Sequence, residues 1–257
     1  MKQHQHVHTM EYYAYKSKLL HVSPGFKSFF TAMTLTLCLW GDNNGVSCFI
    51  ILSMALLNIG KNQVGAKEYL SLLMIPGVFI FLGCFAMILD AGYGAQGWFL
   101  RITRESAGIG IRVMLRSFGA VSALYFLTLS TPMGELVGLF RRLHVPSVIT
   151  ELMYLIYRYI FILLDSQNQL RTAAESRLGY RDFFTSCRTF GASLGNLLVI
   201  TLKKSGAYYD AMISRGYEGE LLFMEENREF KMSWLLWAAL YGLAAAGIRM
   251  VAEGRWL

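Results

Sequence analysis

The 257-residue sequence has little charge and few prolines. Charged residues make up 16% of the chain, hydrophobic residues make up 54%, and only four prolines are present. In soluble domains, charged side chains ordinarily account for about a quarter of the residues. The shortage of charge therefore excludes an ordinary soluble domain of this length and predicts an all-α integral membrane protein.

Cysteine is also scarce, and its spacing excludes the usual disulfide and metal-binding patterns. The four cysteines share no close spacing, and three of them lie in apolar runs. They are Cys38, Cys48, Cys84 and Cys187. We predict small core side chains in a reducing compartment, because paired or metal-binding cysteines would be grouped.

The N-terminus has no apolar segment typical of a cleaved signal peptide, but it is rich in histidine. His4, His6 and His8 alternate, yet no acid or cysteine completes a metal-ligating set with them. We therefore expect no metal site and no cofactor, and we expect these histidines to be solvated and not to form a transport site.

Motifs that carry catalysis or nucleotide binding are missing too. The sequence contains no G-x-x-x-x-G-K-[ST], no H-E-x-x-H and no G-x-S-x-G. Residues 92–97 match G-x-G-x-x-G, but no βαβ pattern surrounds them, so we interpret them as a loop at the membrane surface. The chain is predicted not to be an enzyme. A membrane enzyme using Arg112, Arg116 or Glu151 is the alternative, although no acid, base or metal set supports it.

The charge that is present follows the pattern of a membrane protein. The net charge is +7, but basic residues gather at the N-terminus, between apolar runs and through residues 140–231, where acids nearly balance them. This is the distribution of positive cytoplasmic segments, and it lacks a basic stripe for nucleic acid. We expect a multi-pass membrane protein, in contact with lipid and with no nucleic-acid partner.

Five apolar runs predict about five transmembrane helices. They lie at residues 26–40, 45–59, 69–90, 107–130 and 232–252. The first two are short for a hydrocarbon core of about 30 Å, and the turn at Gly41–Gly45 makes them a helical hairpin. Pro76 is expected to kink the third run.

Two further patterns inside these runs concern packing. Arg112 and Arg116 lie one turn apart on the fourth run, where they either snorkel or pair inside the bundle, or contact a neighbouring subunit. On the last run, Ala238, Gly242 and Ala246 form a stripe of small residues that lets another helix approach closely.

Residues 131–231 form the one large polar region, and they predict a cytosolic domain of two long amphipathic helices, at about 147–178 and 182–215. The first would begin after Pro146. Its apolar part could be mistaken for a sixth span, but burying Glu151 and Arg158 in lipid would cost about 2.5–3.5 kcal/mol each.

Heptad spacing places Glu151, Arg158 and Asp165 on one face of the first of these helices. Asp182 is either the N-cap of the second helix or a plain loop acid. The apolar positions of the second helix include Phe183, Cys187, Phe190, Leu194, Leu197 and Leu198.

The predicted organisation has four parts. They are a cytosolic N-terminal segment (1–25), transmembrane helices 1–4 (26–130), the cytosolic domain (131–231), and the last transmembrane helix with the C-terminus (232–257). With the N-terminus inside, four spans return the chain to the cytosol, and the fifth leaves the C-terminus outside.

Both long amphipathic segments end in similar short motifs. The motif residues are Ser176, Arg177 and Gly179 in the first, and Ser214, Arg215 and Gly216 in the second. Glycine ends a helix readily because it adopts a left-handed conformation without steric cost. The arginine is then held at the helix tip, where its planar guanidinium can bind carboxylates or carbonyls of a partner. Two such tips indicate a membrane protein that grips two soluble partners, or one partner twice.

Several segments resemble the CbiQ family, the transmembrane (T) components of energy-coupling factor (ECF) transporters for cobalt. They are Tyr13–Lys27 (YAYKSKLLHVSPGFK), Thr131-Pro132, Leu139–Pro146 (LFRRLHVP), Tyr157–Tyr159 and the two arginine motifs. The arginine motifs are similar to the paired Ala-Arg-Gly motifs of that family, although both have serine for alanine. Leu178 is inserted between Arg177 and Gly179, which makes Arg215 the safer match.

The resemblance implies a non-catalytic coupling subunit of an ABC-type importer in a bacterial or archaeal cytoplasmic (inner) membrane. Its partners would be two ABC-type ATPases, which hold the tips of the two coupling helices, and a separate membrane subunit (the S component) that binds cobalt or nickel. The six motif residues would be the ATPase-coupling residues. A T component of a vitamin-transporting ECF module is the nearest alternative, and neighbouring genes for ATPases and a metal-specific membrane subunit would discriminate.

Overall fold

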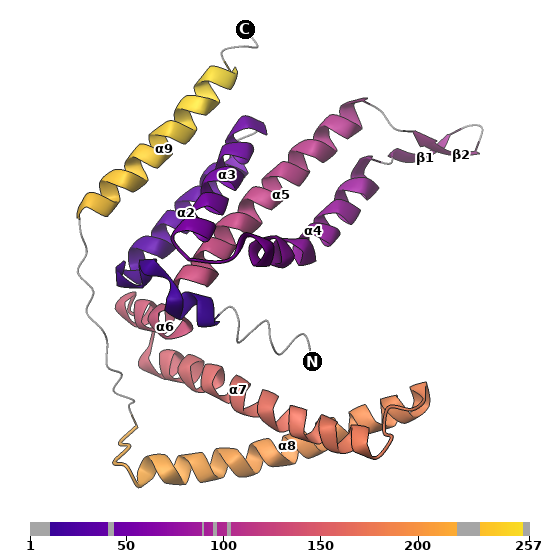
Figure 1. Cartoon of the computed structure of the whole chain (residues 1–257), viewed down its shortest axis with the longest axis vertical. Coiled ribbons are helices and arrows are strands. Elements are labelled where there is room, and N and C mark those ends of the chain that lie inside the picture. The colour runs from indigo at the N-terminus through magenta and orange to yellow at the C-terminus, as the bar shows by residue number, and fades with distance from the viewer. Residues whose placement is uncertain are drawn as a thin grey trace. The chain divides into compact units, whose positions relative to one another are not determined.

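The computed structural model describes residues 11–40, 44–88, 90–94, 97–101, 104–219 and 232–253. The chain divides into two compact units, a first unit of residues 1–132 with 227–257 and a second unit of residues 133–226. The helices of the first unit are α2 (Pro24–Trp40), α3 (Asn44–Gly60), α4 (Ala66–Ile88), α5 (Arg104–Ser130) and α9 (Met232–Glu253) (Figure 1). They confirm the five predicted apolar helices and the all-α class.

Helix α5 is the centre of the first unit, since α2, α3 and α4 all pack against it, and α9 packs on α2 and α3. The core shared by α2, α3, α5 and α9 combines aromatic, aliphatic and small side chains, with Phe30 and Phe126 in edge-to-face contact at 5.8 Å. Gly119 lets α5 approach α2 closely, because a Cβ there would lie 2.9 Å from the Sγ of Cys38.

Three helices are long and apolar enough to cross a membrane, namely Ala66–Ile88, Ser106–Ser130 and Ser147–Ser176, and Asn44–Gly60 and Trp234–Met250 are shorter apolar helices. The third long helix is the one that we excluded as a sixth span. Length and composition alone do not separate the two interpretations, so its position in the cytosol rests on Glu151 and Arg158 and stays a prediction.

Two packing predictions were partly wrong. Cys38 and Cys84 are buried as expected, but Cys48 and Cys187 are exposed. On α9, Gly242 does meet another helix, since a Cβ there would lie 3.7 Å from the Cε of Met33. The stripe continues from Ala238 through Ala245, which are both buried, while Ala246 is exposed. Exact four-residue spacing drifts around a helix of 3.6 residues per turn, so the i+3 position faces inward instead.

The interpretation of residues 92–97 as a loop at the membrane surface was wrong for the residues that the structure describes. Residues 92–94 and 97 lie in two antiparallel strands, β1 (Asp90–Gly94) and β2 (Gly97–Arg101), the two strands among the described residues. The glycine-rich sequence hid the pairing, because glycine is depleted in strands. Helix α4 continues through Pro76, and Gly77 allows close contact with Phe118 of α5.

The segment before α2 packs against the helices of the first unit through a series of buried polar groups. The Ser17 hydroxyl donates to the Asn62 side chain (2.7 Å), and the Asn62 amide donates to Asn58 (2.9 Å). Tyr13 donates a hydrogen bond to Glu68. This segment was predicted only as a cytosolic extension. His4, His6 and His8 lie outside the described residues.

Lys27 on α2 is buried, with 1% of its surface exposed, and its ammonium donates to the backbone oxygen of Ser130 at 2.7 Å. Ser130 is the last residue of α5, where carbonyls lack partners within the helix. A cation at this end also complements the helix dipole. Lys27 therefore ties the start of α2 to the end of α5.

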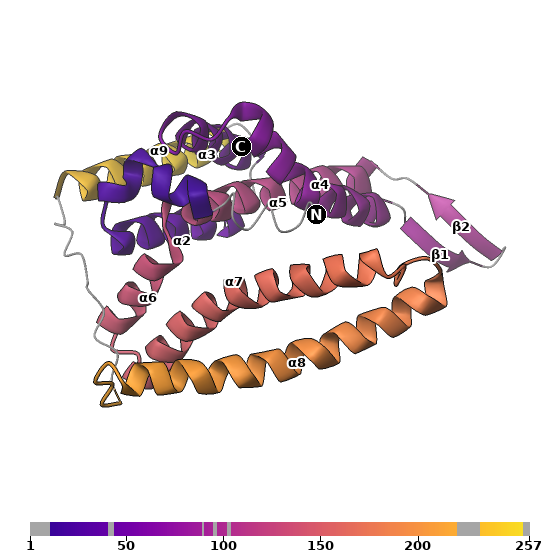
Figure 2. The same ribbon diagram turned by 60° about the horizontal axis from the view of Figure 1, so that its bottom comes forward.

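The second unit contains α6 (Met133–Arg142), α7 (Ser147–Ser176) and α8 (Phe183–Ile213). Helices α7 and α8 confirm the two predicted long helices, with ends shifted by one or two residues, and α7 begins after Pro146 as predicted. They form an antiparallel hairpin (Figure 2). Helix α6 packs on α7 and was not predicted, since ten residues give too few turns for a clear periodic pattern.

Asp182 occupies the N-cap position of α8, but its side chain makes no capping hydrogen bond. Its backbone oxygen instead accepts the hydroxyl and the backbone N–H of Ser186, both at 2.8 Å. The position was thus predicted correctly, while the capping role of the carboxylate was wrong.

Replacing Lys27 tests the tie between α2 and α5. Lys27→Met keeps most of the side-chain volume but leaves the Ser130 carbonyl without this donor, which costs about 1–3 kcal/mol for a buried group. We expect a lower thermal unfolding midpoint of the purified protein in detergent, by about 2–4 °C per kcal/mol. Lys67→Met is the control, because Lys67 is exposed on α4. Equal midpoints for both variants would contradict the proposed tie.

Candidate functional site

The first arginine motif lies at the C-terminus of α7. The backbone N–H of Gly179 donates to Ala174 O at 2.9 Å. The N–H of Leu178 donates to Glu175 O at 3.1 Å. These are the paired hydrogen bonds of a Schellman motif, in which Arg177 is the C-cap and the next residue is left-handed. That residue is Leu178, with φ of 55°.

The second motif ends α8 in the same way. The N–H of Tyr217 donates to Met212 O at 3.1 Å, and that of Gly216 donates to Ile213 O at 3.0 Å. The left-handed residue here is Gly216, with φ of 81°. In this hydrogen-bond pattern Arg215 holds the C-cap position, so it corresponds to Arg177 in the first motif.

The inserted Leu178 therefore does not shift the register of the first arginine. Both arginines directly precede the left-handed residue, and the two glycines serve different purposes. Gly216 supplies the left-handed conformation. Gly179 permits close packing, since a Cβ there would lie 2.9 Å from Ala174 O and 3.0 Å from the Thr189 hydroxyl on α8. The equivalence of Arg177 and Arg215 was not apparent from the sequence, because the two motifs were aligned by their glycines.

Both arginine side chains are exposed, as are the motif serines Ser176 and Ser214. Each serine hydroxyl donates back to its own helix, Ser176 to Thr172 O at 2.9 Å and Ser214 to Ala211 O at 3.0 Å. In the described part of the chain, neither Arg177 nor Arg215 pairs with an acid. Near the first tip, Glu175 is already bound by Arg171 at 2.8 Å.

The antiparallel pairing of α7 and α8 separates the two tips. Thr189 donates to Gly179 O (2.8 Å) at one end, and Lys204 donates to Ser166 (2.8 Å) near the middle. Tyr159 and Tyr208 pack edge to face at 5.4 Å towards the other end. Since α8 has 31 residues, the tips lie about 46 Å apart, at opposite ends of the hairpin.

The Arg215 tip is also connected to the start of α7. The Tyr217 hydroxyl lies 3.4 Å from the Glu151 carboxylate, to which it donates, and Glu151 is buried. Partial burial, and then the nearby carboxylate, raises the pKa of Tyr217, which keeps the hydroxyl a donor. Tyr217 thereby holds the chain after Arg215 against α7.

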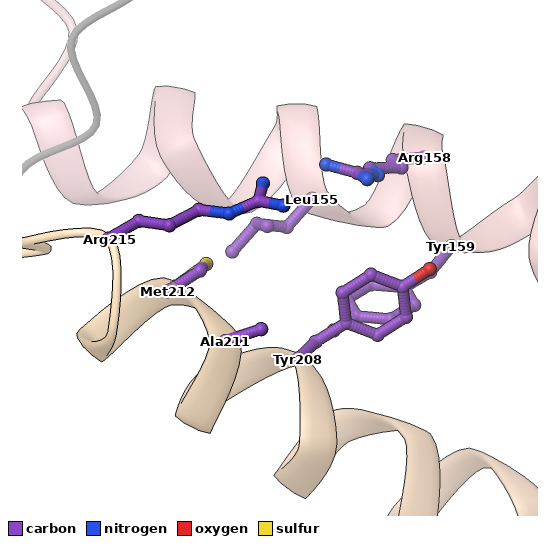
Figure 3. Close-up of a pocket in the computed structure, with 7 residues that line it drawn as sticks. All are labelled: Leu155, Arg158, Tyr159, Tyr208, Ala211, Met212 and Arg215. Carbon is purple, nitrogen blue, oxygen red and sulfur yellow. The ribbon is translucent and has the colours of Figure 1, made fainter.

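A small pocket lies between α7 and α8 beside this tip (Figure 3). Its lining residues are Leu155, Arg158, Tyr159, Tyr208, Ala211, Met212 and Arg215. The guanidinium of Arg158 lies 5.4 Å from the centre of the Tyr208 ring, within the range of a cation–π contact. The heptad pattern that predicted a shared face for Glu151 and Arg158 did not reveal these partners, because they lie on another helix.

No group of three or more metal-ligating side chains occurs among the described residues. The other cationic candidates belong to neither arginine motif. Arg112 on α5 is exposed, while Arg116 is half-buried beside Cys38, whose thiol donates to the Arg116 carbonyl at 3.4 Å. His144, which follows α6, is an exposed residue with φ of 61°.

The same substitution at two glycines of α8 tests the cap geometry. Gly216→Ala should destabilise the end of α8 by about 1–2 kcal/mol, because alanine is strained at positive φ. Gly206→Ala is the control, since Gly206 lies in mid-helix with open space around it, and alanine there should stabilise by about 0.5–1 kcal/mol. Hydrogen exchange of residues 207–215 should therefore become faster in the first variant and slower in the second. Slower exchange in both would rule out a left-handed cap at Gly216.

Comparison with known proteins connects this geometry to a family. A family model described as CbiQ, cobalt transport protein, matches residues 16–225, which include both arginine motifs. The CbiQ cobalt transport protein of Salmonella typhimurium is 26% identical over 218 residues, covering 80% of this chain and 96% of that protein. An uncharacterized protein of Methanocaldococcus jannaschii is 28% identical over 238 residues, covering 90% of this chain and 88% of that protein.

A third relative is a putative fused cobalt transport protein, CbiMQ, of Methanocorpusculum labreanum. It is 29% identical over 230 residues, covering 86% of this chain but 38% of that longer protein. The family match spans most of the sequence, and the apolar helices are those of a membrane protein. The chain therefore belongs to the CbiQ cobalt transport protein family and is a multi-pass membrane component of a transporter.

Proposed function

We propose that this chain is the non-catalytic coupling subunit of an ECF-type ABC importer for cobalt or nickel. The observation that carries the proposal is the pair of exposed arginine C-caps at opposite ends of the α7–α8 hairpin. Each tip offers a fixed backbone turn and a free guanidinium, which can bind carboxylates and carbonyls with a defined geometry.

The separation of the tips favours two docking partners over one partner gripped twice. A distance of about 46 Å between the ends of α8 exceeds the width of one compact binding groove and suits two neighbouring subunits. In the proposed importer these are two ABC-type ATPases. Their closure on ATP would displace both tips, and α7 and α8 would pass the displacement to the membrane subunit that binds the metal ion.

One feature of the sequence and one of the comparisons support the assignment of ATP binding and metal binding to other subunits. No phosphate-binding loop occurs in the sequence, so ATP binding must come from another polypeptide if the importer is ABC-type. The fused relative joins a segment like this chain to a longer remainder within one cobalt transport protein. A separate metal-binding S component would take the place of such a remainder here.

Alanine substitutions at the tips test the coupling role. Arg215→Ala and Arg177→Ala should each weaken association with the ATPases, by about 2–5 kcal/mol if the guanidinium is buried and hydrogen-bonded in the complex. The double variant should be the weakest, and Arg215→Lys should recover only part, since lysine keeps the charge but loses the planar fork. The measurements are co-purification of ATPases expressed from the neighbouring genes, and uptake of radioactive cobalt and nickel by cells.

Lys203→Ala is the control, because Lys203 is an exposed basic residue in the interior of α8, away from both tips. It should leave association and uptake unchanged. Membrane insertion must be normal in every variant. If the double alanine variant binds its ATPases and transports as well as Lys203→Ala, then the arginines are only solvated helix ends and the coupling role is wrong.

A further inference from the structure

We propose that the pocket between Arg158 and Arg215 is a receptor for one carboxylate side chain of the ATPase that docks at this tip. This inference rests on the proposed function, and it adds a second binding residue and the chemistry of the partner group. Arg158 belongs to neither arginine motif and lies almost sixty residues earlier in the sequence.

The two guanidinium groups converge on one place. Figure 3 shows Arg215 extending back along α8 and Arg158 extending towards it, with Leu155 between them. The two guanidinium groups repel each other because both are positively charged. An anion bound between them is attracted to both groups, and these attractions offset the repulsion. Among the described residues that line the pocket, none is acidic. Glu151, the nearest acid along α7, is engaged by Tyr217.

The surroundings strengthen binding of an anion. Leu155, Ala211 and Met212 supply an apolar floor, which lowers the local dielectric and makes each charge interaction stronger than in water. The Tyr208 ring holds the Arg158 guanidinium by a cation–π contact, so less side-chain freedom is lost on binding. The guanidinium plane is then available for paired hydrogen bonds to the two oxygens of a carboxylate.

The size of the pocket selects a small group. Its volume is about 120 Å³, several times the space that one water molecule needs. This accommodates a carboxylate with its neighbouring methylene groups, which is the end of an aspartate or glutamate side chain. A compact acidic side chain on a protein surface therefore fits better than a bulky ligand.

The consequence is that the two tips differ in how they bind. At the Arg177 end, Gly179 packs closely against Thr189 of α8. The Arg177 tip presents its exposed guanidinium to its partner, whereas the Arg215 tip also receives a group from its partner. The two ATPase positions are then unequal even when the two ATPases are identical.

Substituting Arg158 tests the role of the pocket independently of the Arg215 tip. With the full complex, Arg158→Gln should weaken ATPase association on the order of tenfold or more, while Arg158→Lys should weaken it less. The thermal midpoint of the free subunit should change little in both, because Arg158 is exposed. Lys203→Gln, which changes an exposed basic residue in the interior of α8 that does not line the pocket, is the control and should leave association unchanged.

A photo-reactive amino acid identifies the group that enters the pocket. Placed at Ala211, which lines the pocket, it should cross-link to an ATPase peptide containing aspartate or glutamate. Placed at Ala207, an exposed residue one turn earlier that does not line the pocket, it should not give this cross-link. Arg158→Glu combined with lysine at the identified acid should restore the association that Arg158→Glu alone abolishes.

Each contrary outcome has a distinct meaning. If Arg215→Ala weakens association but Arg158→Gln does not, the receptor is wrong and the coupling role stands. If neither variant weakens it, the coupling role fails as well. If Ala211 cross-links to residues 218–231 of its own chain, an internal acidic segment fills the pocket and the proposal is overturned.

Discussion

At residues 177–179 the chain leaves α7 and reverses into α8, and the arrangement of the second unit depends on this reversal. Leu178 takes the left-handed conformation, and the missing side chain of Gly179 lets α8 pack against the end of α7. The Thr189 hydroxyl then closes the turn by donating to Gly179 O. Because the helices are thereby antiparallel, their C-terminal caps are at opposite ends, and one hairpin presents two separate exposed arginines.

The interface between α7 and α8 is small, and many apolar side chains of both helices lie outside it. No residue of α8 is buried, and a row of large side chains along it is exposed, among them Phe190, Leu194, Leu198 and Leu202. On α7, Val148, Leu152 and Ile156 are likewise exposed. Exposed apolar surface of this extent marks contacts with protein or membrane. The second unit thus has the character of a component that gains much of its stability on assembly.

The sequence predicted the elements of the fold better than their contacts. In lipid, a backbone must satisfy its own hydrogen bonds, so long apolar runs specify helices almost by themselves. Helix α6 and the β1–β2 hairpin were missed because both are short and contain glycine. The tie from Lys27 to Ser130 joins residues 103 positions apart, and no local pattern predicts such a partner. A lysine in that segment gave no sign of being buried.

At the site, the sequence supplied the two arginines but not their equivalence or their surroundings. The left-handed residue after a C-cap is usually glycine, so we interpreted Leu178 as an insertion, although Leu178 itself takes the left-handed conformation after the C-cap Arg177. The pocket could not be predicted either, since Arg158 meets Arg215 only through the register in which α7 pairs with α8. That register is fixed by a few side chains, among them Thr189 and Lys204. Backbone geometry thus makes the two tips alike, while helix pairing brings Arg158 of α7 beside Arg215 of α8.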